Sequence, residues 1–454
     1  MDREARGVGR IGGDGGMAVF VPWALPGERV AVKVEAVRPR FCLGSMASIL
    51  RRSPDRVEPA CPVYGRCGGC DALHMRSEAL DDAKEGFVRE ALRRIAGVGS
   101  DWRGFGPIIR CGSAEGSRNK TVYPVCGAAG GGLAKGYYGR SSHSVAVNAG
   151  CPILHGAIEP LCRFMLARLS EAGLTPYDEA TGKGALRKIV VRVGVNTREA
   201  LVGIVLNGAG HLRRLPDGGR LLSRANGFLA GHSGLSDHEV VGFVANVNEG
   251  DTNVIFGDKD VVLDGRGYYI ESLNGVRYKV SLRSFFQVNS AQAERLYQEA
   301  VGMAELGGWE SVADICCGVG AVALQSARFA GKVVGVEVSS AAVADAKENA
   351  AMNGVGNVRF VRAKAEEAYA GLSGEGFDVA FIDPPRKGLD AGLIGSICER
   401  PPKRIVYISC DPATLARDVA AFRGFGYALR HVRPVDMFPG TTHVETVASL
   451  YYLG

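Results

Sequence analysis

Residues 311–324 read SVADICCGVGAVAL, which is an apolar run, a turn with glycines at 318 and 320, and a second, alanine-containing run. A strand, a glycine turn and a helix in this order are typical of a nucleotide-binding βα unit. Further strand-like runs follow at 332–338, 358–363, 377–385 and 404–410, with helical segments between them. This alternation predicts an α/β fold, a Rossmann-like doubly wound parallel sheet, over residues 281–454.

Two other regions precede this sheet. Residues 1–55 contain short alternating segments around a Pro-Gly turn at 26–27, a pattern that favours a small five-stranded barrel of the OB type, although any small β-domain would fit it. Residues 56–280 predict a central α+β domain that begins with a cysteine-rich stretch and an amphipathic helix at 77–95. The expected domains are therefore 1–55, 56–280 and 281–454.

Composition narrows the class of protein. The chain has 454 residues, 46% hydrophobic and 22% charged, which is the balance of a globular protein with several domains. It shows no apolar run of about 18 residues and no leader-like start, so we expect a cytoplasmic protein with reduced cysteines and no membrane partner. The net charge of +6 does not by itself identify a nucleic-acid partner. Residues 101–150 are locally basic, which fits either phosphate contacts or a solvated loop.

A group of cysteines lies in CPVYGRCGGC, where Cys61, Cys67 and Cys70 follow a C-x5-C-x2-C spacing. In a reducing compartment such a group more often binds a metal or cluster than stays free. A zinc site usually pairs two C-x-x-C knuckles, and the second is missing here. Cys151, in AGCPI, is the best candidate for a distant fourth ligand. Three grouped cysteines and one distant one favour an iron–sulfur cluster over zinc.

The glycine turn at 314–320, DICCGVG, predicts a cofactor site. Glu337 ends the next expected strand, where a carboxylate can accept hydrogen bonds from both hydroxyls of a ribose. The fuller G-x-G-x-x-G fingerprint of NAD enzymes is absent because position 323 is Ala. An adenosyl cofactor without a pyrophosphate, S-adenosylmethionine, fits better. A plain sheet turn is the alternative.

Three residues at expected strand ends could carry chemistry. Cys410 follows VYIS and precedes a helix that starts at Asp411-Pro412, and a helix N-terminus lowers a thiol pKa and favours the thiolate. Asp383, in FIDPPRKG, could hold a polar ligand, and Glu445 is the candidate general base. The alternatives are an inert buried cysteine and a surface carboxylate.

Together these motifs resemble the RNA uracil-5-methyltransferase family. The resemblance rests on SFFQVN (284–289), DICCGVG (314–320), FIDPPRKG (381–388), YISCDPATLARD (407–418) and DMFPGTTHVET (436–446). Residues 1–55 resemble the family's TRAM domain, an OB-type RNA binder. Three departures are Cys316, where an aromatic is common in the family, Ala321, where Asn is common, and Asp411, where Asn is usual.

The resemblance implies roles for these residues. Cys410 would add to carbon 6 of a flipped uracil, and Glu445 would remove the proton from carbon 5. The implied cofactor-binding residues are Gln287, Cys316, Gly318, Glu337 and Asp383. The implied 4Fe–4S ligands are Cys61, Cys67, Cys70 and Cys151. Part of the chain after the first cysteines, including helix 77–95, would pack against the catalytic domain.

The resemblance also predicts the partner. The cluster cysteines and the N-terminal barrel favour 23S ribosomal RNA, in a single-stranded or loop region, over transfer RNA, and we expect a monomer that does not act on DNA. The alternatives are uracil methylation in transfer RNA and a non-catalytic RNA-binding iron–sulfur protein.

Overall fold

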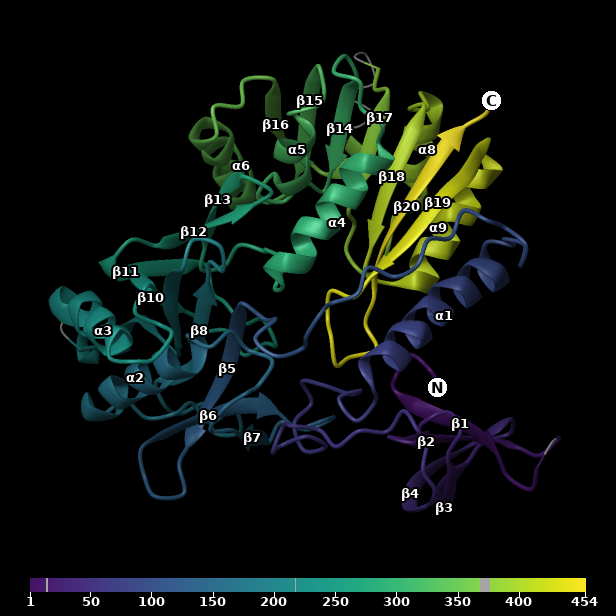
Figure 1. Cartoon of the computed structure of the whole chain (residues 1–454). Coiled ribbons are helices and arrows are strands. Elements are labelled where there is room, and N and C mark those ends of the chain that lie inside the picture. Colours follow the sequence, from purple (N-terminus) through teal and green to yellow (C-terminus); the bar gives the residue numbers. More distant parts are fainter. Residues whose placement is uncertain (14, 217, 368–375) are drawn as a thin grey trace.

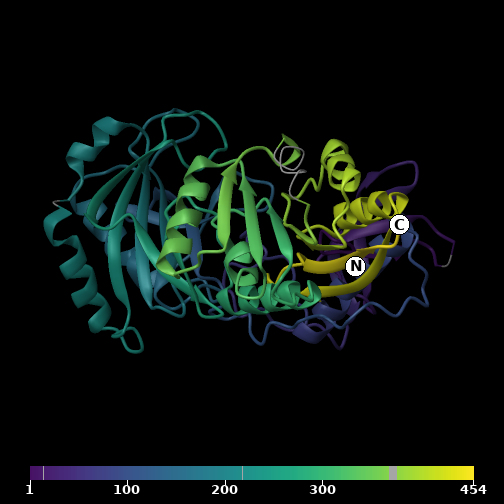
Figure 2. The same ribbon diagram turned by 90° about the horizontal axis from the view of Figure 1, so that it is seen from above.

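The computed structural model describes residues 1–13, 15–216, 218–367 and 376–454. Figure 1 shows three β-sheet regions, with the small N-terminal sheet below the C-terminal sheet and the central sheet to one side. Seen from above, the central and C-terminal sheets lie next to each other along the molecule (Figure 2). None of the helices in the described ranges combines the length and the apolar character that a membrane span requires.

The N-terminal sheet has the strand order β1-β2-β4-β3. β2 and β4 pair in parallel, and the other two pairs are antiparallel. Val19, Val21, Ala24 and Cys42 form its small core. The small β-domain is as predicted, although the described residues form four strands and not the five expected of an OB-type barrel. The strands are β1 (Arg6–Arg10), β2 (Ala18–Pro22), β3 (Arg29–Val37) and β4 (Phe41–Arg51).

Helix α1 (Ser77–Ile95) lies against the C-terminal sheet region rather than the N-terminal one (Figure 1). Val88 and Leu92 belong to the same core as Leu415 and Val419 of α9. The buried face repeats every four residues, through Leu80, Lys84, Val88 and Leu92, as expected for one side of a helix. The following segment, 104–110, runs parallel to β19 along its edge, with bridges Phe105–Val432 and Ile109–Val435.

The central sheet has the order β11-β10-β9-β8-β5-β6-β7. Helices α2 (Ile158–Glu171) and α3 (Leu221–Ala230) pack on one face through a shared apolar core. The other face contributes to the core of the C-terminal region, together with the hairpin of β12 (Tyr268–Leu273) and β13 (Val276–Ser281). The strands are β5 (Lys120–Gly127), β6 (Leu133–Tyr138), β7 (Val145–Val147), β8 (Leu186–Val193), β9 (Glu199–Leu206), β10 (Glu239–Val247) and β11 (Lys259–Gly265).

The C-terminal sheet has the order β16-β15-β14-β17-β18-β20-β19. Its first five strands are parallel and confirm the predicted Rossmann-like sheet, whereas β20 runs antiparallel between β18 and β19. The strands are β14 (Ser311–Ile315), β15 (Lys332–Glu337), β16 (Val358–Arg362), β17 (Val379–Ile382), β18 (Arg404–Ser409), β19 (Tyr427–Val435) and β20 (Glu445–Tyr452). The helices include α4 (Ser290–Met303), α5 (Ala321–Ser326), α6 (Ser340–Met352), α8 (Ala391–Glu399) and α9 (Pro412–Gly424).

Candidate active site

The register of the parallel strands brings three of the predicted residues into one row. Ile315 of β14 pairs with Val336 of β15 and with Ile382 of β17. The next residues along these strands are Glu337, Cys316 and Asp383, so they lie side by side at the carboxyl edge of the sheet. In doubly wound sheets this edge is where ligands bind.

The glycine turn after β14 has an unusual backbone conformation. Cys316, Gly318 and Gly320 have φ angles of 65°, 55° and 82°, a region that non-glycine residues enter at a cost. A Cβ atom at Gly320 would come within 2.8 Å of the ring of Phe360, so this position also requires glycine for space. The backbone amide of Gly318 donates to Oε2 of Glu337 at 3.1 Å. The turn is therefore folded around the carboxylate that is predicted to bind ribose.

Cys410 and Glu445 meet across an antiparallel strand pair. Ser409 of β18 is opposite Thr446 of β20, and one residue further along, Cys410 is opposite Glu445. Directly opposed residues point to the same face of a sheet. Glu445 is buried, so it is not the surface carboxylate that sequence reasoning leaves open.

Three carboxyl groups share this edge, of which Asp314 and Glu445 are buried and Asp383 is half-buried. Burial raises the pKa of Asp383 to about 7. Burial and the nearby Asp383 raise the pKa of Asp314 to about 8 and that of Glu445 to about 8. The guanidinium of Arg386 opposes the shift at Glu445. Once ionised, these carboxylates outnumber the single arginine and favour a ligand that carries positive charge.

The thiol of Cys410 is placed as predicted, but its pKa shifts in the other direction. Burial, followed by the Glu445 carboxylate, raises the pKa of Cys410 to about 11, while Arg386 lowers it through its charge and a hydrogen bond. Asp411 caps α9 by accepting from the amides of Ala413 (2.8 Å) and Thr414 (3.1 Å). The capping carboxylate occupies the helix N-terminus, and the predicted lowering of the thiol pKa by that end does not outweigh burial and the acids.

Gln287 lies in the segment between β13 and α4 and is buried. The side chain of Asn119, at the start of the central sheet, donates to the Gln287 carbonyl at 3.2 Å and to Oγ of Ser290 at 2.9 Å. In the same segment the Phe285 ring is 73% exposed. The segment is thus fixed at Gln287 and presents an aromatic face two residues earlier.

The four predicted cluster ligands are close enough to affect one another. Burial, followed by Cys151, Cys67 and Cys61, raises the pKa of Cys70 to about 12. Burial and the same group of thiols raise the pKa of Cys151 to about 11. However, within the described part of the chain no set of three or more His, Cys, Asp or Glu side chains is arranged to hold a metal ion. The structure brings the four cysteines together without forming a metal centre.

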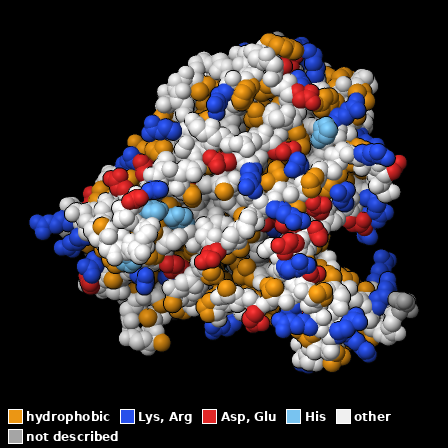
Figure 3. Space-filling model, in the orientation of Figure 1, with side chains coloured by type: hydrophobic (Ala, Val, Ile, Leu, Met, Phe, Trp, Pro, Cys, Tyr) orange, Lys and Arg blue, Asp and Glu red, His pale blue; other side chains and the backbone are white. Residues whose placement is uncertain are grey.

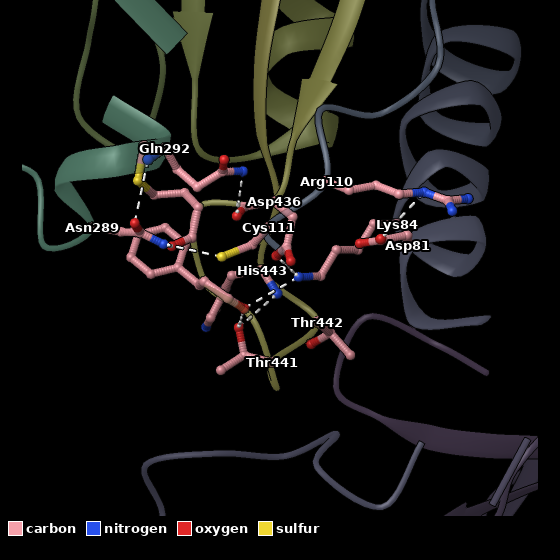
Figure 4. Close-up of polar contacts among 12 residues, drawn as sticks. Asp81, Lys84, Arg110, Cys111, Asn289, Gln292, Asp436, Thr441, Thr442 and His443 are labelled. Atoms are coloured by element: carbon pink, nitrogen blue, oxygen red, sulfur yellow. Dashed lines mark hydrogen bonds and ion pairs between the residues drawn. The ribbon is translucent and has the colours of Figure 1, made fainter. Parts of the chain in front are cut away.

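Sequence reasoning missed several residues that hold the active-site loops. Lys84, Asn289 and Gln292 contact the segment that precedes Glu445 (Figure 4). Arg3, at the N-terminus, forms an ion pair with Asp411, next to Cys410. These residues come from distant parts of the sequence, and apart from Asn289, which ends the SFFQVN motif, no motif marks them.

Comparisons with known proteins match two regions of the chain. Residues 259–451 match the model of the tRNA (Uracil-5-)-methyltransferase family, and residues 2–47 match the TRAM domain. An uncharacterized RNA methyltransferase of Halalkalibacterium halodurans is 39% identical over 99% of this chain and 95% of its own. A second, from Thermosynechococcus vestitus, is 38% identical over 95% and 92%.

The chain belongs to the RNA uracil-5-methyltransferase family. A solved structure, the Pyrococcus abyssi tRNA (uracil-54, C5)-methyltransferase in complex with S-adenosyl-L-homocysteine, matches with a TM-score of 0.74 and 26% identity. These findings establish an S-adenosylmethionine-dependent RNA methyltransferase with a TRAM domain, as the resemblance implies.

The N-terminal region is a weaker guide to the substrate than the sequence predicts. The Pyrococcus abyssi match covers 98% of this chain and 100% of the other, so an enzyme named for transfer RNA extends over the N-terminal region as well. The presence of that region in a uracil-5-methyltransferase therefore does not by itself distinguish ribosomal from transfer RNA.

Proposed function

We propose that this enzyme methylates carbon 5 of uracil in RNA through a covalent adduct between Cys410 and carbon 6. The observation that carries the proposal is the position of Cys410 and Glu445 directly beyond the Ser409–Thr446 pair of β18 and β20, at the carboxyl edge of the sheet that bears the glycine turn. A nucleophile and a base in adjacent positions suit a reaction that needs addition on one carbon and proton removal from its neighbour.

Each residue then has one task. The Cys410 thiolate forms a bond to carbon 6, and the electron pair of the 5,6 double bond becomes available at carbon 5. S-adenosylmethionine, when bound, supplies the methyl group to carbon 5 and leaves as the neutral thioether. The Glu445 carboxylate takes the carbon-5 proton, the double bond re-forms, and the Cys410 thiolate is expelled. Arg386 favours the charged forms of both groups.

The cofactor would bind along the row at the carboxyl edge. Glu337 would accept hydrogen bonds from the ribose hydroxyls. Gly318 and Cys316 would line the turn, while Gln287 and Asp383 would contact cofactor or uracil. The acids around the pocket would favour the positive charge of the sulfonium.

RNA would reach the site over the N-terminal sheet. Its strands β3 and β4 and the residues beside them expose Arg29, Lys33, Arg38, Arg40, Arg51 and Arg52, and Lys and Arg side chains are seen on this domain in Figure 3. Such a basic surface suits phosphate contacts. The exposed Phe285 ring suits stacking on a flipped base.

We propose 23S ribosomal RNA, in a single-stranded or loop region, as the substrate, with the enzyme working as a cytoplasmic monomer. The resemblance of the cysteine set supports ribosomal RNA, and twelve free thiols support a reducing compartment. Transfer RNA is the second candidate, because the Pyrococcus abyssi enzyme is named for it. Labelled methyl transfer to each purified RNA, followed by nucleoside analysis for 5-methyluridine, separates the two.

We also propose that Cys61, Cys67, Cys70 and Cys151 bind a 4Fe–4S cluster. Their mutual effect on thiol pKa supports proximity, and each iron of a cluster takes its own cysteine, so these ligands need not converge on one metal ion. Anaerobic purification should give about four iron and four sulfide per chain. Stoichiometric zinc without iron would rule the cluster out.

A further inference from the structure

The segment between β19 and β20, residues 436–444, is a loop closed at its base. Val435 pairs with Glu445 at the point where the two strands meet. The proposed base is therefore the first residue after this loop, which we call the base loop. Any movement of the base loop at its Asp436 side is transmitted to the Val435–Glu445 pair.

Three consecutive carbonyls of the base loop accept hydrogen bonds from side chains outside it (Figure 4). Gln292 of α4 donates to the Asp436 carbonyl at 2.9 Å, and Asn289, the cap of α4, donates to the Met437 carbonyl at 3.3 Å. Lys84 of α1 donates to the Phe438 carbonyl at 3.2 Å. A loop backbone held at successive residues has little freedom to shift.

Lys84 makes the strongest of these attachments. Its side chain is fully buried and forms an ion pair with the carboxylate of Asp436. Asp81 lies nearby on the same helix, and burial and Asp436 raise its pKa to about 6 while Lys84 lowers it. One buried lysine thus forms an ion pair with the Asp436 side chain and a hydrogen bond to the Phe438 carbonyl. Its removal would leave the Asp436 carboxylate unpaired.

The tip of the base loop is held by two further segments. The Thr442 amide donates to Oδ1 of Asp71 at 3.0 Å, and the Ala72 amide donates to the Gly440 carbonyl at 3.0 Å. Oγ1 of Thr442 donates to the Arg3 carbonyl at 2.8 Å. Cys410 is carried by β18 and by the capped start of α9, where Arg3 pairs with the capping Asp411. The contacts from Lys84, Asn289 and Gln292 therefore bear on the base, whereas Arg3 lies beside both the base loop and the nucleophile.

We infer that Lys84 is a positioning residue for Glu445, which it holds in place through the base loop. The inference rests on the proposed function, in which Glu445 removes the carbon-5 proton after methylation. Loss of Lys84 should leave cofactor binding, RNA binding and formation of the Cys410 adduct close to normal. It should slow release of the methylated RNA, because a small misplacement of a catalytic group lowers its rate by large factors.

The test compares wild type with Lys84→Met, which keeps an unbranched side chain of similar length but removes the charge. Lys84→Met/Asp436→Asn also removes the carboxylate that the first change leaves unpaired, in case the single variant does not fold. Arg93→Met is the matched control, since Arg93 lies on the exposed side of the same helix and pairs only with Glu90 among the described contacts. Thermal unfolding and calorimetry with S-adenosylmethionine show which variants are folded.

Single-turnover reactions with the RNA substrate then separate adduct formation from adduct release. We expect both Lys84 variants to form the methylated adduct at the wild-type rate and to release it roughly 10- to 100-fold more slowly, so that it accumulates on a denaturing gel. Arg93→Met should match wild type. The inference would be overturned if a folded Lys84 variant released the methylated RNA at the wild-type rate. It would also be overturned if RNA binding, adduct formation and adduct release were all reduced by the same factor. A wild type that forms no adduct at all would instead contradict the proposed function.

Discussion

Glu445 is the proposed general base of this site, and the proposed reaction depends on its protonation state. It is buried, its pKa is raised to about 8, and its neighbours include Cys410 and Arg386. A base of this pKa is largely protonated at neutral pH and becomes competent as the pH rises. In the proposed mechanism, Glu445 and the Cys410 thiol therefore both have to lose a proton before they react.

The first prediction concerns pH. Because Glu445 and Cys410 both have a raised pKa, the fraction in the reactive charged form grows with increasing pH. We expect kcat/KM to rise from about pH 7 through the pKa of Glu445, which is about 8, and to keep rising toward about pH 9 because the thiol pKa is about 11. Initial rates of labelled methyl transfer across this range check it, and a rate that falls over the same interval would contradict these assignments.

The second prediction concerns Glu337. Its carboxylate accepts the Gly318 amide at 3.1 Å and the Ser339 amide at 2.8 Å, so it is fixed before any ligand arrives. Glu337→Ala should weaken S-adenosylmethionine binding by about 1.5–3 kcal/mol for each missing hydrogen bond to the charged group. Calorimetry measures this directly, with Glu348→Ala, on the exposed side of α6, as the control. If Glu337→Ala and Glu348→Ala bound S-adenosylmethionine with equal affinity, Glu337 would not be part of the cofactor site.

Among the helices and strands, the sequence predicted the structure correctly where a single hydrophobic pattern dominated the segment. The run from 311 to 324 gave both the strand and the glycine turn, because an apolar strand and two glycines leave few alternatives. Helix 77–95 has its expected bounds, and its apolar residues Leu80, Phe87, Leu92 and Ile95 predict a shared face, of which Leu80 and Leu92 are buried and Phe87 and Ile95 are not. Ile95 is exposed and Lys84 is buried, because the helix packs on α9 and on Asp436, which no local pattern reveals. The apolar residues of 253–258, NVIFGD, also predict a strand, but this segment is not one, and Lys259–Gly265 pairs with β10 instead.

The third prediction tests this helix contact. Leu92 is 2% exposed and belongs to the core that α1 shares with α9. Leu92→Ala should lower the free energy of unfolding by about 2–5 kcal/mol, measured by denaturant titration. Ile95→Ala, at an exposed position of the same helix, should have a much smaller effect. Similar losses in both variants would mean that α1 does not dock as described.

The fourth prediction links the cysteine segment to the base loop. Asp71 follows Cys70 directly and accepts the Thr442 amide. Cys70→Ser should loosen residues 71–72, if a cluster orders this segment, and should increase hydrogen exchange at Thr442 without a comparable change in α9. Unchanged protection at Thr442 in a folded Cys70→Ser protein would show that the two segments are independent.

At the scale of the whole molecule, the catalytic centre depends on parts of the chain that are far apart in sequence. Arg3 reaches Asp411, Asp71 reaches Thr442 and Lys84 reaches Asp436. The motifs for the nucleophile, the base and the cofactor turn were identifiable from sequence because each is local. The residues that hold these motifs together were not, since their partners are fixed only by the packing of three sheets.

The fifth prediction concerns RNA binding by the whole enzyme. Arg38 and Arg40 are exposed on the N-terminal sheet region, where they could neutralise phosphates. Replacing both with Ala should weaken RNA binding and reduce the slope of log affinity against log salt by about 1 for each phosphate that the variant no longer neutralises. Lys347→Ala, on exposed α6, should leave the slope unchanged. An unchanged slope in the double variant would place the RNA path elsewhere.

The most direct test of the central claim is a denaturing gel of enzyme mixed with its RNA and cofactor. In the Glu445→Gln variant, Cys410 should still add to carbon 6 of uracil and carbon 5 should still be methylated, but the carbon-5 proton should not be removed. A slowly migrating band of enzyme joined to RNA should therefore accumulate. Wild type should give the same band with RNA containing 5-fluorouridine, because fluorine does not leave as a proton does. Cys410→Ala should give no band in either case and no methyl transfer. Methylation by Cys410→Ala, or no band from wild type with the fluorinated RNA, would contradict the Cys410–Glu445 mechanism.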